Sequence, residues 1–507
     1  MIKLSFISCL LFVVTYSVNA TVKPKDYGLL AANNGIERYW ALYNAHEEAN
    51  RLGTVVDYSG IDSISIEIPN RAKSIPISGS QNFRGLCLTV KNSNVKDFTL
   101  FVCNKKAKII DVPQSIIDGN DFRSIPELSR GVIILIIKDN TPWVDNREGH
   151  NYGAVRRDVL LLKNGISQNR TIMPYGNEGM SVPECRYVEA DSKKKKIRNL
   201  TFIRTADSQY KTLLISIENI NNIELSNIQC FTPEDKTKYG DAIISVKGST
   251  NVTYRNIYIE GMYTQSDKYG YGLTMNNVWN VKLYNVRGNV SQGLICNSNI
   301  NHSYLKSCDI NRYDIHCYGR DAVLEDCTFR GMYFPVSSFY GRIIFKRCSF
   351  VKAQPVWLRA DYNAYTPFDI ELYDCSWYPV KGKNAICYTG MLNKLVSRRE
   401  ELREKCWPSI KIRGLDVYPP DDLDAIYMFR VGGGDALNQP IGYMPYVDVK
   451  GINVHSPGVK LDVCNKTINP LNETEVKIMQ TRSSRAVVRI ESIFLNGFQD
   501  NKRNIKR

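Results

Sequence analysis

Histidine and long apolar runs are scarce in this 507-residue chain, which has five histidines against 66 lysines and arginines. The apolar run at residues 4–14 is too short to span a membrane, so we expect no membrane span. With Lys3 before the run and Val18-Asn19-Ala20 after it, the pattern predicts a secretory signal peptide at residues 1–20, cleaved near Ala20. No cysteine follows directly, which argues against a lipid anchor. We expect a secreted or periplasmic protein.

The number of cysteines in the predicted mature chain is odd, so they cannot all form disulfides with one another. The chain has 14 cysteines, and Cys9 lies in the predicted signal peptide, which leaves an odd number. Most of the others occupy repeat positions that favour a small buried apolar residue, so we predict buried free thiols there. Cys406 and Cys464 are the better disulfide candidates. A zinc site built from the repeat cysteines is not favoured, because they stand at apolar, inward positions.

Acidic residues are fewer than basic ones, so the formal net charge is +15 and the pI is about 9.1. Basic runs at residues 193–196 and 502–507 are typical of solvated loops. The global excess nevertheless favours an anionic partner. For an exported protein, we expect an acidic polysaccharide rather than nucleic acid.

The early chain predicts a helix followed by strands. Asn34-Gly35-Ile36-Glu37 opens a helical stretch that ends at Gly53, and strands are expected at residues 54–57 and 64–69. Apolar runs at residues 86–90, 98–102 and 132–138 are interpreted as early, irregular rungs of a repeating structure.

A repeat begins near residue 197, and each unit is a short strand, a one-residue turn and a second short strand. The turn is often Asn, Asp or Gly, as in Asn199, Asn227 and Gly414. The steps are mostly about 20–30 residues, and stacking such units would bury a continuous core. The residue after the turn forms an apolar column: Leu200, Ile228, Ile257, Val286, Cys308, Cys327, Cys348, Cys375, Leu415 and Ile452.

This pattern resembles the pectate-lyase-like superfamily over roughly residues 25–460. The resemblance implies an all-β, right-handed, single-stranded parallel β-helix of about ten or more coils with an N-terminal capping helix. We predict the β-helix domain with its cap at residues 21–460 and a C-terminal cap with a basic tail at residues 461–507. The resemblance is weaker for activity, because this fold carries lyases, hydrolases, epimerases and adhesins.

The stretch from Arg312 to Asp321 concentrates the chemically active side chains. Strand alternation sends Ile315 and Cys317 to one face, and Asp314, His316 and Tyr318 to the other. Aligning the preceding strands of each rung predicts two outward columns. They are Ser216, Ser245, Thr274, Ile295, His316, Ser337 and Trp357, and Glu218, Lys247, Asn276, Asn297, Tyr318, Phe339 and Arg359.

These columns predict a surface for an acidic sugar chain and the chemistry of β-elimination. His316 and Tyr318 are the candidate base and acid, in either order, with Arg320 or Asn297 stabilising the charge on the substrate carboxylate. The residue set resembles the Asn, His, Tyr and Arg chemistry of glycosaminoglycan lyases on other folds. The candidate substrate-binding residues are Lys247, Asn276, Arg312, Asp314, Trp357 and Arg359.

We therefore predict a polysaccharide lyase acting on chondroitin sulfate, dermatan sulfate or hyaluronan. A hydrolase needs two carboxylates flanking the bond, and the ladder offers Glu218, Asp314 and Asp361 without a tight pair. A pectate-type lyase would need clustered outward carboxylates for calcium, which the central strands lack. A non-catalytic glycan-binding protein is the remaining alternative. We expect no cofactor, no metal and a monomer.

Overall fold

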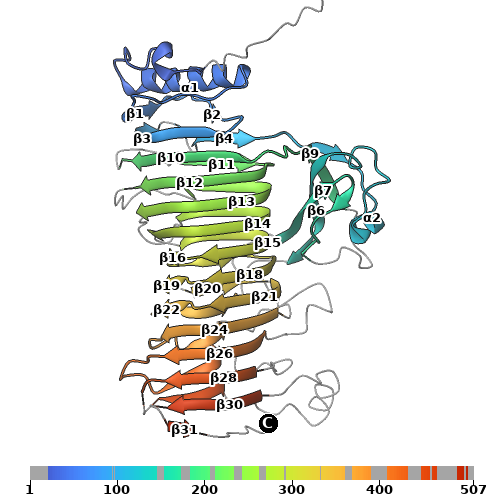
Figure 1. Cartoon of the computed structure of the whole chain (residues 1–507), viewed down its shortest axis with the longest axis vertical. Coiled ribbons are helices and arrows are strands. Elements are labelled where there is room, and N and C mark those ends of the chain that lie inside the picture. Colours follow the sequence, from blue (N-terminus) through green and yellow to red (C-terminus); the bar gives the residue numbers. More distant parts are fainter. Residues whose placement is uncertain are drawn as a thin grey trace, which may run out of the picture.

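The computed structural model shows an all-β chain whose parallel strands stack along one long axis, the architecture of a parallel β-helix (Figure 1). The described residues are 21–93, 95, 98–144, 154–172, 183–205, 212–232, 242–261, 270–290, 293–331, 333–337, 339–359, 368–389, 408–431, 447–456, 459–464, 488–495 and 498–500. No helix in this described part is long and apolar enough to cross a membrane. The predicted signal peptide lies outside it. Handedness and coil number stay predictions.

The N-terminal end of the stack carries the predicted helix. After the short 3-10 helix η1 (Pro24–Tyr27), α1 (Gly35–Arg51) lies across the end next to β1 and β2 (Figure 1). The Asn34 side chain accepts a hydrogen bond from Glu37 N at 2.9 Å and so satisfies one of the helix's exposed N–H groups. Leu42 and Ala45 are buried in the core beneath. The capping helix is therefore confirmed.

Two sheets account for the strands. The large sheet contains β1 (Ser63–Ile68), β2 (Ile75–Pro76), β3 (Gln81–Ser93), β4 (Phe98–Asn104), β10 (Lys195–Arg204), β11 (Thr212–Glu218), β12 (Asn221–Phe231), β13 (Ile244–Gly261), β14 (Tyr271–Val290), β15 (Gly293–Lys306), β16 (Asp309–Ile310), β17 (Tyr313–Ile315), β18 (Gly319–Glu325), β19 (Thr328–Arg330), β20 (Tyr333–Val336), β21 (Phe339–Lys346), β22 (Ser349–Val351), β23 (Gln354–Leu358), β24 (Phe368–Tyr378), β25 (Ala385–Thr389), β26 (Ser409–Val417), β27 (Ala425–Val431), β28 (Val447–Val454), β29 (Lys460–Cys464), β30 (Val488–Leu495) and β31 (Phe498–Asp500). The second sheet contains β5 (Lys108–Ile110), β6 (Val132–Val144), β7 (Ala154–Lys163), β8 (Ile166–Ser167) and β9 (Glu184–Glu189).

The repeat predicted from the sequence is confirmed in its register. Leu200 pairs with Ile228, which pairs with Ile257, and that column continues to Val286. Each residue before the column adopts the left-handed conformation that bends the chain between two strands, where Asn, Asp and Gly are favoured. These turn residues are Asn199, Asn227, Asn256, Asn285, Ser307, Asp326, Arg347, Asp374, Gly414 and Gly451.

The cysteine column also agrees with the sequence prediction. Cys308, Cys327, Cys348 and Cys375 are buried in the apolar core, and each is a free thiol. Burial raises the pKa of the Cys348 thiol well above its usual value, which keeps it protonated. Cys406 lies outside the described residues.

The prediction that residues 132–138 form a rung was wrong. They belong to β6, which pairs antiparallel with β7 and β9 in the small second sheet. The stack itself passes directly from β3 to β10 and from β4 to β11. Residues 105–194 are therefore an insertion, which also contains α2 (Gln114–Gly119) and projects beside β13, β14 and β15 (Figure 1). The insertion has its own apolar core around Leu135, Leu160 and Phe122.

Hydrogen bonds fasten the insertion to the stack. Asn299 accepts from Arg157 N at 2.7 Å, and Asn301 Nδ2 donates to the carbonyl of Arg170 at 2.7 Å. Trp279, on β14, packs against apolar residues of β6 and β7. The contacts fall where each rung bends after its opening strand, so the insertion borders that edge of the rungs.

Candidate functional site

The outward side chains of the opening strands form a surface that we call the first-strand face. These strands are β11, the starts of β13, β14 and β15, and then β17, β20 and β23. The first observed column is Ser216, Ser245, Thr274, Cys296, Asp314, Pro335 and Trp357. The second is Glu218, Lys247, Asn276, Ser298, His316, Ser337 and Arg359.

The observed columns differ from the predicted ones at three rungs. The register is shifted by one residue at β15 and by two residues at β17 and β20, and the two-residue shifts place His316 and Ser337 in the second column instead of the first. Leu273 pairs with Ile295, not with Leu294, and a one-residue slip exchanges the two faces of a strand. Asn297, predicted to point outward, is therefore fully buried beside the Tyr313 hydroxyl. Cys296 takes the outward place instead. The sequence hides this slip, because Leu294 and Ile295 are both apolar.

Asp314 is the centre of the first-strand face. Its carboxylate is fully buried, yet it points outward and forms ion pairs with two guanidiniums. Arg312 Nη2 binds Oδ2, and Arg359 Nη1 lies 3.1 Å from Oδ1. A Cβ on Gly293 would lie 2.9 Å from the Arg312 side chain, so a glycine there leaves room for this arginine. The structure thus brings together three of the predicted substrate-binding residues.

The electrostatics of this cluster keep the carboxylate ionised. Burial by itself would raise the pKa of Asp314. The neighbouring charges of His316, Arg359 and Arg312 outweigh burial and hold that pKa below its usual range. Electrostatic interactions of these buried side chains are stronger than those at the open surface, because the site contains little water.

His316 lies at the edge of this cluster, where solvent reaches it. Its Nε2 is 2.8 Å from Asp314 Oδ2, and its side chain is 19% exposed. The Tyr271 hydroxyl lies 3.2 Å from the same nitrogen and donates to Asp314 Oδ2 at 3.3 Å. Cys296 Sγ is 3.7 Å from both ring nitrogens. A carboxylate on one imidazole nitrogen fixes the tautomer and leaves the other nitrogen to act as a base.

Tyr271 and Cys296 were missed by the sequence prediction. Burial, followed by the charge of Asp314, raises the pKa of the Tyr271 hydroxyl above its usual value, so it keeps its proton. The same two causes raise the pKa of the Cys296 thiol. Tyr271 is the first residue of β14 and lies before the positions aligned from the sequence, so strand alternation gave no signal for it. Cys296 was hidden by the register slip.

The predicted outward orientation of Tyr318 was wrong. Strand β17 ends at Ile315, and Tyr318 adopts a left-handed turn with φ of 58°, which ends the alternation of faces. Its ring is 1% exposed. Burial raises the pKa of its hydroxyl well above the usual value. Cys317 is buried, as expected.

Arg320 contacts the insertion. Its Nη1 donates to the carbonyls of Thr171 and Ile172, at 3.1 Å each, and its Nε lies 3.6 Å from Asp321. These contacts give it a role in fastening the insertion to the stack.

The remaining predicted binding residues lie along the first-strand face. Lys247 is 56% exposed and lies 3.3 Å from Glu218, three rungs before the strand of Asp314. Asn276 and Trp357 are half-buried, and Trp357 stands opposite Pro335 and Tyr388. Among the described residues, no group of three His, Cys, Asp or Glu side chains is placed to hold a metal ion.

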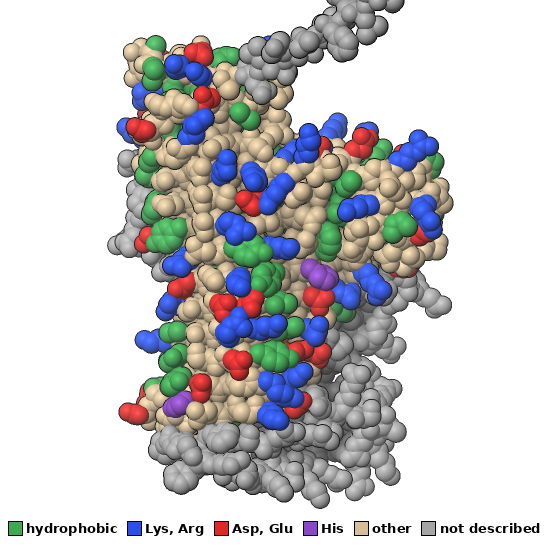
Figure 2. All heavy atoms as spheres, in the orientation of Figure 1, with side chains coloured by type: hydrophobic (Ala, Val, Ile, Leu, Met, Phe, Trp, Pro, Cys, Tyr) green, Lys and Arg blue, Asp and Glu red, His purple; other side chains and the backbone are tan. Residues whose placement is uncertain are grey.

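Another face of the stack carries mixed charge. Figure 2 shows Lys and Arg side chains interleaved with Asp and Glu along the molecule. The second strands of the rungs carry such ion pairs, including Lys194 with Glu224 at 2.6 Å and Arg413 with Asp448 at 2.6 Å. Exposed ion pairs of this kind contribute little free energy.

Comparison with known proteins identifies the fold. No family model matches the chain, and no curated protein matches its sequence. Among solved structures, the tailspike gp61 of Pseudomonas phage phi297 is similar with a TM-score of 0.55, at 13% identity over 88% of this chain and 76% of that one. The chain has the parallel β-helix fold of phage tailspikes.

Two further tailspikes support this similarity. The tailspike gp49 of Pseudomonas phage LKA1 gives a TM-score of 0.52 at 13% identity, over 87% of this chain and 76% of that one. The Gp54 tailspike of Acinetobacter baumannii bacteriophage AP22 gives 0.53 at 10% identity, over 95% and 76%. That structure is a complex with a capsular saccharide from A. baumannii. At such low identities, the structural similarity shows a shared fold alone.

Proposed function

We propose that the protein is an exported polysaccharide lyase that cleaves a uronate-containing chain by β-elimination on the first-strand face. The observation that carries this proposal is the 2.8 Å contact between Asp314 and His316 at the solvent edge of a cluster that contains two arginines. A base next to basic side chains is what removal of the proton at C5 of a uronate requires.

The roles follow from the contacts. Asp314 stays ionised and accepts a hydrogen bond from the N–H at His316 Nε2, so that Nδ1 takes the C5 proton and the imidazole becomes an imidazolium. Arg312 and Arg359 stabilise the negative charge on the enolate-like carboxylate. Tyr271 keeps its proton near the same nitrogen, and it replaces Tyr318 as the acid for the leaving oxygen.

The substrate class follows from charge and fold. A net charge of +15 favours an acidic polymer, and glycosaminoglycans such as chondroitin sulfate, dermatan sulfate and hyaluronan carry uronates. A structural neighbour with a bound capsular saccharide supports a glycan as the ligand of this fold.

Hydrolysis is less favoured by the carboxylates of this face. A hydrolase needs a general acid whose pKa is raised, together with a second carboxylate. In the described columns the carboxylates are Glu218 and Asp314, and the pKa of Asp314 is lowered. Glu218 lies beside Lys247. Asp361, the third candidate from the sequence, lies outside the described residues.

Kinetics of site variants test these roles. On the polymer that the wild type degrades, His316→Ala should lower kcat at least about a hundredfold, because general base catalysis contributes that much. Tyr271→Phe should lower kcat by a similar factor. Tyr318→Phe is the matched control, because it removes the same atom from a buried phenol, and its kcat should stay close to wild type in folded protein.

The opposite effects of the two tyrosine variants would assign the role of the acid to Tyr318. If Tyr318→Phe abolished turnover and Tyr271→Phe did not, the assignment of Tyr271 would be wrong. If folded His316→Ala kept its turnover, the first-strand face would not be the active site.

A further inference from the structure

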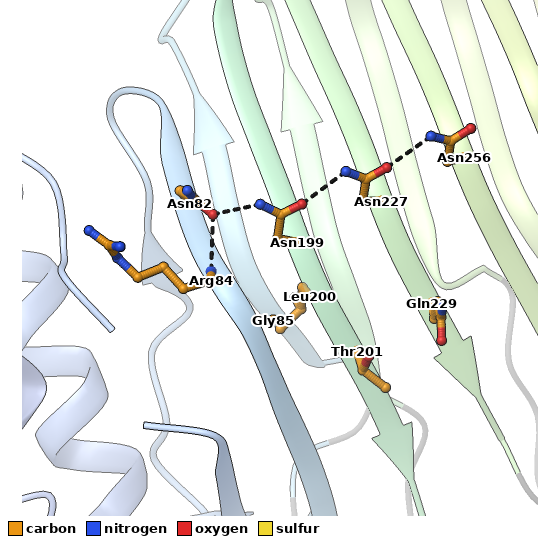
Figure 3. A pocket seen from close by; sticks show the side chains of 9 residues that line it. All are labelled: Asn82, Arg84, Gly85, Asn199, Leu200, Thr201, Asn227, Gln229 and Asn256. Carbon is orange, nitrogen blue, oxygen red and sulfur yellow. Dashed lines mark hydrogen bonds between the residues drawn. The ribbon is translucent and has the colours of Figure 1, made fainter. Parts of the chain in front are cut away.

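A hollow lies away from the first-strand face, at the bend between the second and third strands of several rungs. Its volume is about 730 Å³, and it lies next to β3, β10, β12 and β13 (Figure 3). Ligand pockets commonly have volumes of about 300–1,000 Å³. The lining residues are Asn82, Arg84, Gly85, Asn199, Leu200, Thr201, Asn227, Gln229 and Asn256.

The wall of this hollow is a rigid row of amides. Asn199 donates to Asn82, Asn227 to Asn199, and Asn256 to Asn227, each at 2.9 Å (Figure 3). The last three adopt left-handed turns, so the backbone as well as the hydrogen bonds fixes their side chains. A preorganised polar row loses little conformational entropy when it binds a ligand.

Arg84 lies at one end of the row of amides, because strand β3 has two extra residues at this turn. Arg198 pairs with Asn82 and Leu200 with Leu86, so three residues of β3 stand opposite one residue of β10. The extra length places Arg84 in a left-handed conformation with φ of 57°, which is uncommon for a long side chain. Asn82 Oδ1 accepts from Arg84 N at 3.0 Å and ties this loop to the amide row.

The guanidinium of Arg84 is available at the surface. It is 56% exposed, and its Nε lies 3.0 Å from Asp57 Oδ1. This single contact orients the side chain. Because a guanidinium has five N–H donors, its other donors can bind a carboxylate in a bidentate manner.

We propose that this hollow is a saccharide-binding subsite, separate from the first-strand face, that takes an acidic sugar unit. The carboxylate of the sugar binds Arg84, and its hydroxyls bind the amide row together with Gln229 and Thr201. Rungs are about 4.8 Å apart, so successive amides meet successive positions along one sugar chain. The subsite does not depend on the proposed lyase reaction.

Binding titrations test the subsite directly. Isothermal titration calorimetry would use three hexasaccharides as probes: one of hyaluronan, one of galacturonate and, as the neutral match, maltohexaose. Chromatography of the probes afterwards would verify that they stay intact. We expect at least one acidic probe to bind more tightly than maltohexaose. Arg84→Ala should weaken that binding about tenfold, the effect of one hydrogen bond to a charged group.

A matched arginine provides the control. Arg330 is 57% exposed and lies 2.8 Å from Asp309, which closely resembles the setting of Arg84. Arg330→Ala should change the affinity by less than about twofold. Gln229→Ala, an exposed substitution on the floor of the hollow, should weaken binding in protein with unchanged thermal unfolding. Equal affinities of Arg84→Ala and Arg330→Ala, or equal binding of neutral and acidic probes, would overturn the proposal.

Discussion

Asp314 holds together the charged side chains at the centre of the first-strand face. It is a buried carboxylate on the outward side of a strand, and it is tolerated because Arg312, Arg359 and His316 surround it. Breaking a buried ion cluster leaves uncompensated charge, which costs far more than loss of an exposed pair. The sequence predicted that these residues lie close together. It did not predict their burial, because packing between rungs decides burial.

Asp314→Asn should lower the free energy of unfolding by about 3–5 kcal/mol, because two buried guanidiniums would lose a counter-charge that they share. The measurement is urea unfolding followed by circular dichroism. Asp309→Asn, which removes the exposed partner of Arg330, should cost less than about 1 kcal/mol. Equal costs for the two variants would contradict the burial of the Asp314 cluster.

His46 makes stability depend on pH. It is fully buried against Tyr58, and burial lowers its pKa to about 3. The unfolded chain binds a proton below about pH 6.5, whereas the folded chain does not until about pH 3, so acid favours unfolding. We expect a loss of up to about 5 kcal/mol between these pH values. His46→Gln should flatten this dependence in urea unfolding curves, and an unchanged slope would contradict it.

At the scale of the element, the turns were predictable and the register was not. The one-residue turns are chemically constrained, because left-handed backbone favours Asn, Asp and Gly, and every predicted turn residue from Asn199 to Gly451 adopts it. Strand register depends on which apolar residue faces inward. With Leu294 and Ile295 adjacent, either choice satisfies the apolar pattern, and the sequence prediction took the wrong one.

Asn227 tests the contribution of the turns. Asn227→Ala should cost about 2 kcal/mol, because it puts a side chain with no polar group into a left-handed turn and removes ladder hydrogen bonds. Asn227→Gly loses the same hydrogen bonds but tolerates the backbone, so it should cost about 1 kcal/mol less. If urea unfolding shows glycine to be as costly as alanine, the backbone argument fails.

Arg320 tests how the insertion is held. Arg320→Ala removes two hydrogen bonds to the carbonyls of Thr171 and Ile172. Hydrogen exchange in residues 166–172 should become faster, while exchange in the strands of the stack stays unchanged. Mass spectrometry of peptic fragments gives both readings. Arg342→Ala, an exposed arginine beside Glu371, is the control and should leave the insertion unaffected.

For the whole molecule, the repeat predicted the parallel stack and its capping helix, because both rest on local apolar patterns. The insertion was missed, because its strands are as apolar as rungs, and residues 132–138 differ from them only in their antiparallel partners. Long-range pairing of this kind leaves no local signal. Function follows the same division, because the fold is shared with tailspikes, while the proposed chemistry depends on side chains of the first-strand face.

The most direct test of elimination is ultraviolet absorbance of the protein with chondroitin sulfates, dermatan sulfate, hyaluronan, heparin, pectate and alginate, with and without a chelator. Elimination creates a double bond conjugated to the uronate carboxylate, so we predict a rise in absorbance on at least one uronate polymer, and the rise should be lost in folded His316→Ala. New reducing ends without a rise in absorbance would contradict the lyase assignment and indicate hydrolysis.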